Sequence, residues 1–306
     1  MNSLVFDCEL VSPLFLYGAD QKNPELRAPS LKGNLRFWWR AVQAEKNISL
    51  LKAQEGKIFG GTGSKVDTGH NAGKTSQGQE GRSSFTIKIA SEKINKQQES
   101  QLPHKPTNFK PTAIVNTLFK IECLYVRLPE EFSDIKLKAL VELTSLLGGM
   151  GKRSRRGFGS FRILRCNGQK SELAELKQED VLPQILKRLN ILSDNKFALN
   201  KGVITLINNP SASYPFIETI ALGKAYQNVD EILRKIGNSS HENNSKYTGY
   251  SAGKDRFASP EYVSLIKGGQ GEVWPVITSL HLALKTGINF SHEKDTRKAF
   301  REAILS

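Results

Sequence analysis

The chain has 306 residues, of which 38% are hydrophobic, and this composition excludes a polypeptide that is disordered as a whole. Lys and Arg total 44 against 30 for Asp and Glu, and the resulting net charge of +14 favours a polyanionic partner such as nucleic acid. We find no run of the ~20 apolar residues that a spanning helix needs and no basic start of a signal peptide, so we expect a cytoplasmic protein without membrane contact.

The first half of the sequence predicts a β-α-β-β-α-β order. Its strands show alternating or β-branched apolar residues, and its helices show apolar residues at helical spacing. Ser30 is placed to cap the first helix. This order is the ferredoxin-like, RRM-like arrangement. The predicted elements are strand 4–11, helix 31–47, strand 85–89, strand 114–128, helix 135–147 and strand 161–164.

Residues 60–84 interrupt this order with GGTGSKVDTGHNAGKTSQGQEGRSS, which has no periodicity and almost no apolar residue. Such a composition buries too little surface to offset the entropy lost on ordering. We expect a mobile loop. Within it, GHNAGKT resembles an ATP-binding P-loop only superficially, because one residue is missing between the glycines and no apolar strand precedes it.

The second half is compatible with a second domain of the same kind. Polar residues at 168–171 mark the boundary, which gives domains 1–168 and 169–306. The fold class we predict is α+β, with two ferredoxin-like domains packed together. The elements predicted in this half are strand 203–207, helix 217–236, strands 262–266 and 276–284, and helix 292–305.

The first helix carries Lys32, Arg36 and Arg40 at a spacing of four residues, which places three cations on one helical face. This stripe predicts either contact with RNA or a solvated helix face. Trp38 and Trp39 fit the buried face better than they fit base stacking.

The glycine-rich loop LGGMGKRSRRGFGSF at 147–161 contains four cations and no acid. Glycine permits close approach of another chain, and guanidinium groups bind phosphate in bidentate fashion. We therefore predict a phosphate-binding loop, against the alternative of a solvated basic turn. The predicted RNA-binding residues of the loop are Lys152, Arg153, Arg155, Arg156 and Gly157.

Three motifs resemble known families. A helix followed by G-G-x-G, five residues and G-x-G at 148–159 is similar to the glycine-rich signature of the RAMP superfamily of CRISPR proteins. K-G-x-L-R-x-W-W-R-A at 32–41, followed by I-F-G-G, resembles the first subunit of the type III-B Cmr module. R-x-A-S-P at 256–260 and the later W-P-V resemble the C-terminal half of that subunit. There Lys254 and Arg256 are either further RNA contacts or a solvent-exposed pair.

The resemblance implies a non-catalytic RNA-binding subunit of a Cmr ribonucleoprotein complex. Such a subunit helps to bind guide RNA and target RNA, and its partners are the other Cmr subunits, which carry the cleavage activity. No cofactor and no metal are implied.

A metal-independent, guide-processing endoribonuclease is the alternative, because some RAMP proteins cleave RNA with a histidine. The chain has five histidines, and no two of them have the spacing of metal ligands. Asp20 and Asp67 lie in expected loops without a second acid nearby. We expect no catalytic residue.

Overall fold

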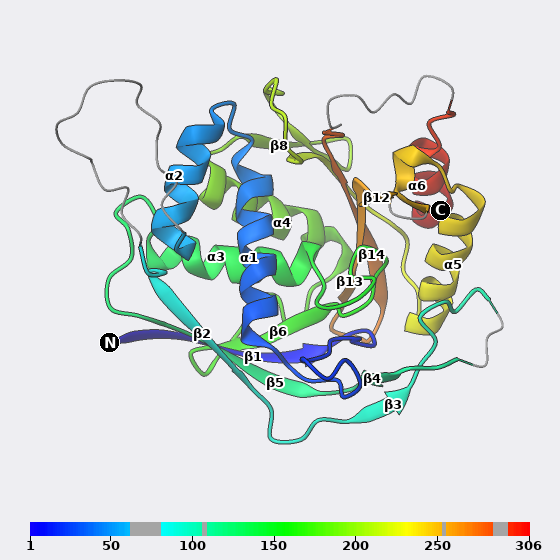
Figure 1. Cartoon of the computed structure of the whole chain (residues 1–306), viewed down its shortest axis with the longest axis horizontal. Coiled ribbons are helices and arrows are strands. Elements are labelled where there is room, and N and C mark those ends of the chain that lie inside the picture. Colours follow the sequence, from blue (N-terminus) through cyan, green and yellow to red (C-terminus); the bar gives the residue numbers. More distant parts are fainter. Residues whose placement is uncertain (62–80, 106–108, 253–254, 284–292) are drawn as a thin grey trace.

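The computed structural model describes residues 1–61, 81–105, 109–252, 255–283 and 293–306 (Figure 1). They form a mixed α/β structure with two five-stranded antiparallel sheets. A layer of helices lies between the sheets, and the sheets approach one another where β6 contacts β13. No helix among these residues is long and apolar enough to cross a membrane.

The first sheet comes from the N-terminal half and has the order β2-β5-β1-β6-β7. Every pairing in it is antiparallel. On β1 the residues Leu4, Phe6 and Cys8 are buried and their neighbours are partly exposed, as the alternation in the sequence predicts. The strands are β1 (Asn2–Leu10), β2 (Phe85–Ala90), β5 (Leu118–Tyr125), β6 (Phe161–Cys166) and β7 (Gln169–Lys170).

Four helices lie on one side of this sheet, where α1 contacts β2 and α3 contacts β6, and two of them, α3 and α4, also contact the second sheet (Figure 1). Ser133 caps α3 by accepting a hydrogen bond from the amide of Lys136. The first helix begins before the predicted cap Ser30, because Pro29 is well suited to the first helical turn. The helices are α1 (Ala28–Gln43), α2 (Ile48–Phe59), α3 (Asp134–Leu147) and α4 (Gln178–Ser193).

The second sheet has the order β13-β14-β10-β9-β8, and its pairings are also antiparallel. Every residue of β14 is buried, because α3 packs on one face of this sheet and α6 covers the other. The strands are β8 (Phe197–Asn200), β9 (Val203–Leu206), β10 (Ile217–Leu222), β13 (Glu261–Lys267) and β14 (Val273–Leu280). The outer helices are α5 (Val229–Glu242) and α6 (Arg297–Leu305).

Several predicted elements need correction. The predicted helix 217–236 is the strand β10 followed by α5, because Gly223 ends the strand and Asn228 caps a new helix. The predicted strand 114–128 is divided into β4 (Thr112–Ile114) and β5 by a left-handed Asn116. The helices α2 and α4 were not predicted.

The remaining elements are short. They are β3 (Lys96–Gln98), which pairs with β4, the 3-10 helix η1 (Lys246–Thr248), and the pair β11 (Tyr250–Ala252) and β12 (Asp255–Phe257). Most of the predicted mobile loop at 60–84 lies outside the described residues, as does the start of the predicted last helix at His292.

Candidate nucleic-acid interface

The glycine-rich loop joins α3 to β6 and is attached to both halves of the chain. The amide of Lys152 donates to the carbonyl of Phe15 (2.8 Å), which follows β1. On the other side, the amide of Gly157 donates to Val263 of β13 (2.9 Å), and the amide of Val263 donates to Arg155 (3.2 Å). The loop therefore runs beside β13 and pairs with it at a short parallel bridge.

The loop glycines allow close approach, but the approaching chain is the protein's own. A Cβ atom at Gly149 would collide with the carbonyl of Phe158, and one at Gly159 would collide with the carbonyl of Met150. Gly157 has a φ of +82° and is buried beneath side chains of α5 and β13. The expectation that Gly157 touches RNA is therefore corrected, because its space is already filled.

Two loop arginines bind carbonyl groups of the second half. Arg155 donates to the carbonyl of Ser259, and its guanidinium lies over the ring of Phe37, 5.4 Å from the centroid. Arg156 donates to the carbonyls of Glu261 and Thr248, both at 3.0 Å. These contacts direct both side chains toward the protein interior, whereas the sequence predicted contact with phosphate.

Both guanidinium groups nevertheless keep their positive charge. Burial, and next the charges of Arg153 and Arg155, lower the pKa of Arg156 to about 10, which is still well above neutral pH. Carbonyl groups satisfy hydrogen bonds without cancelling a full charge. None of the four loop cations forms an ion pair with a carboxylate among the described residues.

Arg153 and Lys152 differ from each other in exposure. The Nε atom of Arg153 is buried and has no hydrogen-bond partner within the described residues, and burial lowers the pKa of Arg153. Lys152 is exposed, with its Nζ atom 4.8 Å from the centre of the Tyr17 ring. Of the loop cations, Lys152 is the one whose side chain faces solvent.

The stripe on α1 lies next to this loop, because Asn34 of α1 donates to the carbonyl of Gly149 (2.9 Å). Arg36 and Arg40 both pair with Glu55 of α2, and their side chains remain 41% and 42% exposed. Lys32 lies 5.3 Å from the centre of the Phe85 ring. Arg36 and Arg40 thus share one buried acid, and Lys32 donates to the carbonyl of Phe85 (3.3 Å), which leaves this face of α1 positively charged.

The two tryptophans are in the core, as predicted: Trp38 is fully buried and Trp39 is 4% exposed. Phe37 of α1 was not predicted as a site residue. Its side chain is only partly buried, and its ring contacts Tyr262 of β13 and Arg155 of the loop. Glu55 was also missed. Its position one turn before the end of an unpredicted helix gave no signal that it pairs with the stripe.

The two C-terminal candidates are placed less completely. Lys254 lies outside the described residues. Arg256 belongs to β12 and pairs through its backbone with Ser251 of β11.

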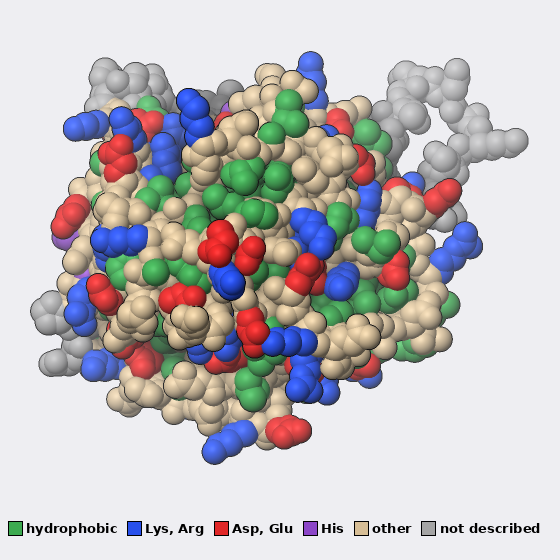
Figure 2. Space-filling model, turned by 180° about the vertical axis from the view of Figure 1, so that it is seen from behind, with side chains coloured by type: hydrophobic (Ala, Val, Ile, Leu, Met, Phe, Trp, Pro, Cys, Tyr) green, Lys and Arg blue, Asp and Glu red, His purple; other side chains and the backbone are tan. Residues whose placement is uncertain are grey.

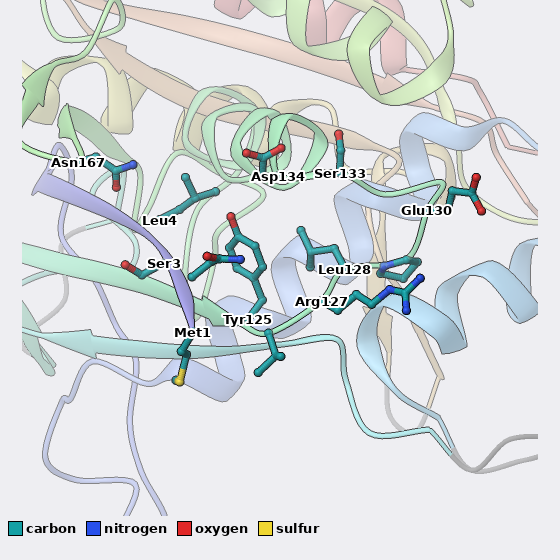
Figure 3. Close-up of a pocket in the computed structure, with 13 residues that line it drawn as sticks. Met1, Ser3, Leu4, Tyr125, Arg127, Leu128, Glu130, Ser133, Asp134 and Asn167 are labelled. Atoms are coloured by element: carbon teal, nitrogen blue, oxygen red, sulfur yellow. The ribbon is translucent and has the colours of Figure 1, made fainter.

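A hollow with a volume of about 760 Å³ lies elsewhere, at the start of β1 and of α3 (Figure 3). Tyr125, Arg127, Glu130 and Asp134 lie around it, so its charges are mixed. Since the glycine-rich loop follows the other end of α3, this hollow is separated from the loop by about 20 Å of helix. The back of the molecule likewise shows acidic and basic side chains interspersed (Figure 2).

Three of the five histidines, His104, His241 and His281, lie among the described residues. Among the described residues, no group of three or more His, Cys, Asp or Glu side chains is arranged to hold a metal ion. His104 and His241 have ring centres 5.9 Å apart. Burial, and then the charges of Arg153, Lys105 and His241, lower the pKa of His104.

The chain is similar in sequence to one known protein family and to two curated proteins. A family model described as the RAMP superfamily matches residues 7–162. The CRISPR system Cmr subunit Cmr1-2 of Pyrococcus furiosus is 31% identical over 183 residues, which are 53% of this chain and 96% of that protein. The Cmr subunit Cmr1-1 of the same organism is 26% identical over 249 residues, covering 72% of this chain and 65% of that protein.

Solved structures show the same fold. The apo crystal structure of Cmr1 from Pyrococcus furiosus matches with a TM-score of 0.65 at 20% identity, covering 99% of this chain and 96% of that chain. A chain in the cryo-EM structure of the Type III-B Cmr-beta bound to cognate target RNA matches with a TM-score of 0.61 at 11% identity, covering 99% of both chains. The resemblance read from the three motifs is confirmed.

Proposed function

The chain belongs to the RAMP superfamily, and we propose that it is a non-catalytic, RNA-binding subunit of a type III-B CRISPR (Cmr) ribonucleoprotein complex in the cytoplasm. Its partners are guide RNA, target RNA and the other Cmr subunits. The curated relatives are Cmr subunits, and one structural relative comes from a Cmr assembly bound to target RNA. Both observations support the assignment.

The observation that carries the proposal is the uncompensated charge where α1 meets the glycine-rich loop. The four loop cations have no carboxylate partner among the described residues. In the stripe, Arg36 and Arg40 share Glu55, while Lys32 donates to the carbonyl of Phe85. A positive surface of this kind attracts a phosphate backbone. Direct contacts to phosphate come from the exposed Lys152 and the partly exposed Lys32, Arg36 and Arg40, while Arg155 and Arg156, which bind carbonyl groups, add to the positive field.

We interpret both halves as ferredoxin-like domains, with the boundary near residue 168. In the first half, β1, α1, β2, β5, α3 and β6 follow the β-α-β-β-α-β order, and the strand order β2-β5-β1-β6 fits it. In the second half, β10, α5, β13, β14 and α6 follow the same order. There β9 lies beside β10, where a last strand belongs, although it comes first in the chain.

The first sheet does not serve as an RRM-type stacking surface. Its face away from the helices carries charged side chains paired across strands, including Lys120 with Asp7 and Lys88 with Glu122. RNA recognition by an RRM sheet needs aromatic side chains on that face. The interface therefore lies at α1 and the loop, on the helical side.

A salt series with single-stranded RNA tests the function. With about five phosphates neutralised, log K should fall against log salt with a slope near −3.5. Lys152→Ala should weaken binding and flatten the slope, because an exposed phosphate contact is lost. The matched control is Lys177→Ala, which removes an exposed lysine flanked by Glu175 and Glu179. A flat salt dependence for the parent would contradict RNA binding.

The endoribonuclease alternative rests on one observation, the proximity of His104 and His241. The Nδ1 atom of His104 is buried against α5 near Gly237 and has no described partner to orient it for proton transfer. Incubating labelled repeat RNA with the purified chain without metal separates the two functions. We expect intact RNA, and site-specific cleavage that disappears in His104→Ala would favour the enzyme.

A further inference from the structure

Gly33 is an exposed residue in the interior of α1, where the structure does not require glycine. It has a helical backbone, and a Cβ atom there would meet no atom within 4 Å in the part of the chain that the structure describes. By contrast, Gly149 and Gly159 of the loop would each collide with a carbonyl group if they carried a Cβ. Glycine inside a helix is less stable than alanine, so neither folding nor packing explains this residue.

The surroundings of Gly33 point to an anionic chain. One turn further along α1, on the same face, are Arg36 and Phe37. Arg36 is 41% exposed, and the guanidinium of Arg155 lies over the Phe37 ring on the loop side. Lys32 precedes Gly33 directly. A strip of bare helix backbone is thus bordered by cations on both sides, and a missing side chain there permits close approach.

We propose that the sugar–phosphate backbone of bound single-stranded RNA crosses α1 at Gly33, in contact with the bare helix backbone. This inference rests on the proposed RNA-binding function and adds a location to it. Arg36 binds a phosphate on one side of the crossing, and Arg155 supplies positive charge on the other. The missing side chain at Gly33 determines where the RNA crosses the helix, while the neighbouring cations attract its phosphates.

The test uses substitutions whose effects on folding and on binding have opposite signs. Gly33→Ala and Gly33→Leu both introduce better helix formers, so each should raise the melting temperature, by about 2 °C for alanine. Both should weaken RNA binding, and Gly33→Leu should do so about tenfold or more, because its side chain fills the crossing point. A merely structural glycine would not give this combination.

Gly56→Ala is the matched control, because Gly56 is also helical and a Cβ atom there also meets no described atom within 4 Å. It should raise the melting temperature without changing RNA affinity. If Gly33→Leu binds RNA as the parent does, the inference is overturned while the RNA-binding function stands. The same holds if it keeps RNA affinity but no longer assembles with Cmr subunits, since the face then contacts protein. If the parent shows no salt-dependent RNA binding, the proposed function itself fails.

Discussion

The α1 stripe and the glycine-rich loop look alike in sequence, since each places three or four cations together near glycine. In the structure they differ in what surrounds the charge. Arg36 and Arg40 pair with a single acid and stay about two-fifths exposed. Arg155 and Arg156 instead donate to carbonyls of residues about a hundred positions later. The comparison shows that clustered cations in a sequence predict a positive electrostatic potential. They do not predict whether the side chains are free to bind a ligand.

Removing Arg156 should give the largest effect on folding if the loop arginines are structural. Arg156→Ala removes a donor from the carbonyl of Thr248 and one of two side-chain donors from that of Glu261, which keeps the Ser259 hydroxyl, and it exposes one side of Phe300. We expect the free energy of unfolding to fall by about 3 kcal/mol. Arg165→Ala on β6 is the matched control, because Arg165 is exposed, and it should change stability by less than ~0.5 kcal/mol. Denaturant titration measures both, and equal stabilities would remove the distinction between stripe and loop.

Gly157→Ala tests how tightly the loop is fixed against the second half. Its Cβ would lie 3.1–3.3 Å from side chains of Leu233, Ile236 and Leu265, at a φ of +82°. Gly168 has a similar φ of +78° and open space, so Gly168→Ala reports the backbone term alone. We expect a loss of about 1 kcal/mol for Gly168→Ala and about 2 kcal/mol for Gly157→Ala. Identical losses would mean that α5 gives way and does not clamp the loop.

The stripe is tested without leaving a buried charge unpaired. Arg36→Gln and Arg40→Gln are combined with Glu55→Gln, because Glu55 is only 5% exposed and would otherwise lose both partners. Loss of two phosphate contacts should weaken single-stranded RNA binding about tenfold and reduce the salt slope by about 1.4. Glu55→Gln alone is the control and should bind at least as well as the parent. A triple variant with the parent's affinity would place the RNA elsewhere.

The smallest expected effect is a change in how stability depends on pH when His104, whose pKa is affected by Arg153 of the loop, is replaced. Its pKa is lowered in the folded state, so between the folded and unfolded pKa values the unfolded chain binds more protons. Stability should therefore fall as the pH drops below the unfolded value of about 6.5. His104→Gln should be less sensitive to pH between 7.5 and 5.5, by under about 1 kcal/mol. If the parent and the variant lose stability in parallel, the pH dependence comes from other titratable groups.

The sequence predicted the first half better than the second, and the reason is physical. The alternation on β1 and the tryptophans of α1 report one buried face each, so periodicity identified them. In β10 the two buried residues, Ile217 and Ile220, are three apart, because the strand register shifts between Ile217 and Thr219. This spacing resembles that of a helix, and a helix was predicted instead. At the site, the positive charge could be predicted because it depends only on which residues are present. The carbonyl partners of Arg155 and Arg156 could not, because backbone acceptors have no sequence signature.

The attachment of the loop to β13 also bears on how the chain is made. Arg156 is synthesised 92 residues before Thr248 and 105 before Glu261, the residues whose carbonyls it binds. At a translation rate of 5–20 residues per second, that interval lasts on the order of 5–20 s. During it the first half has emerged from the ribosome with a charged loop whose acceptors do not yet exist. The loop is then open to cellular polyanions, and the second half closes over it last.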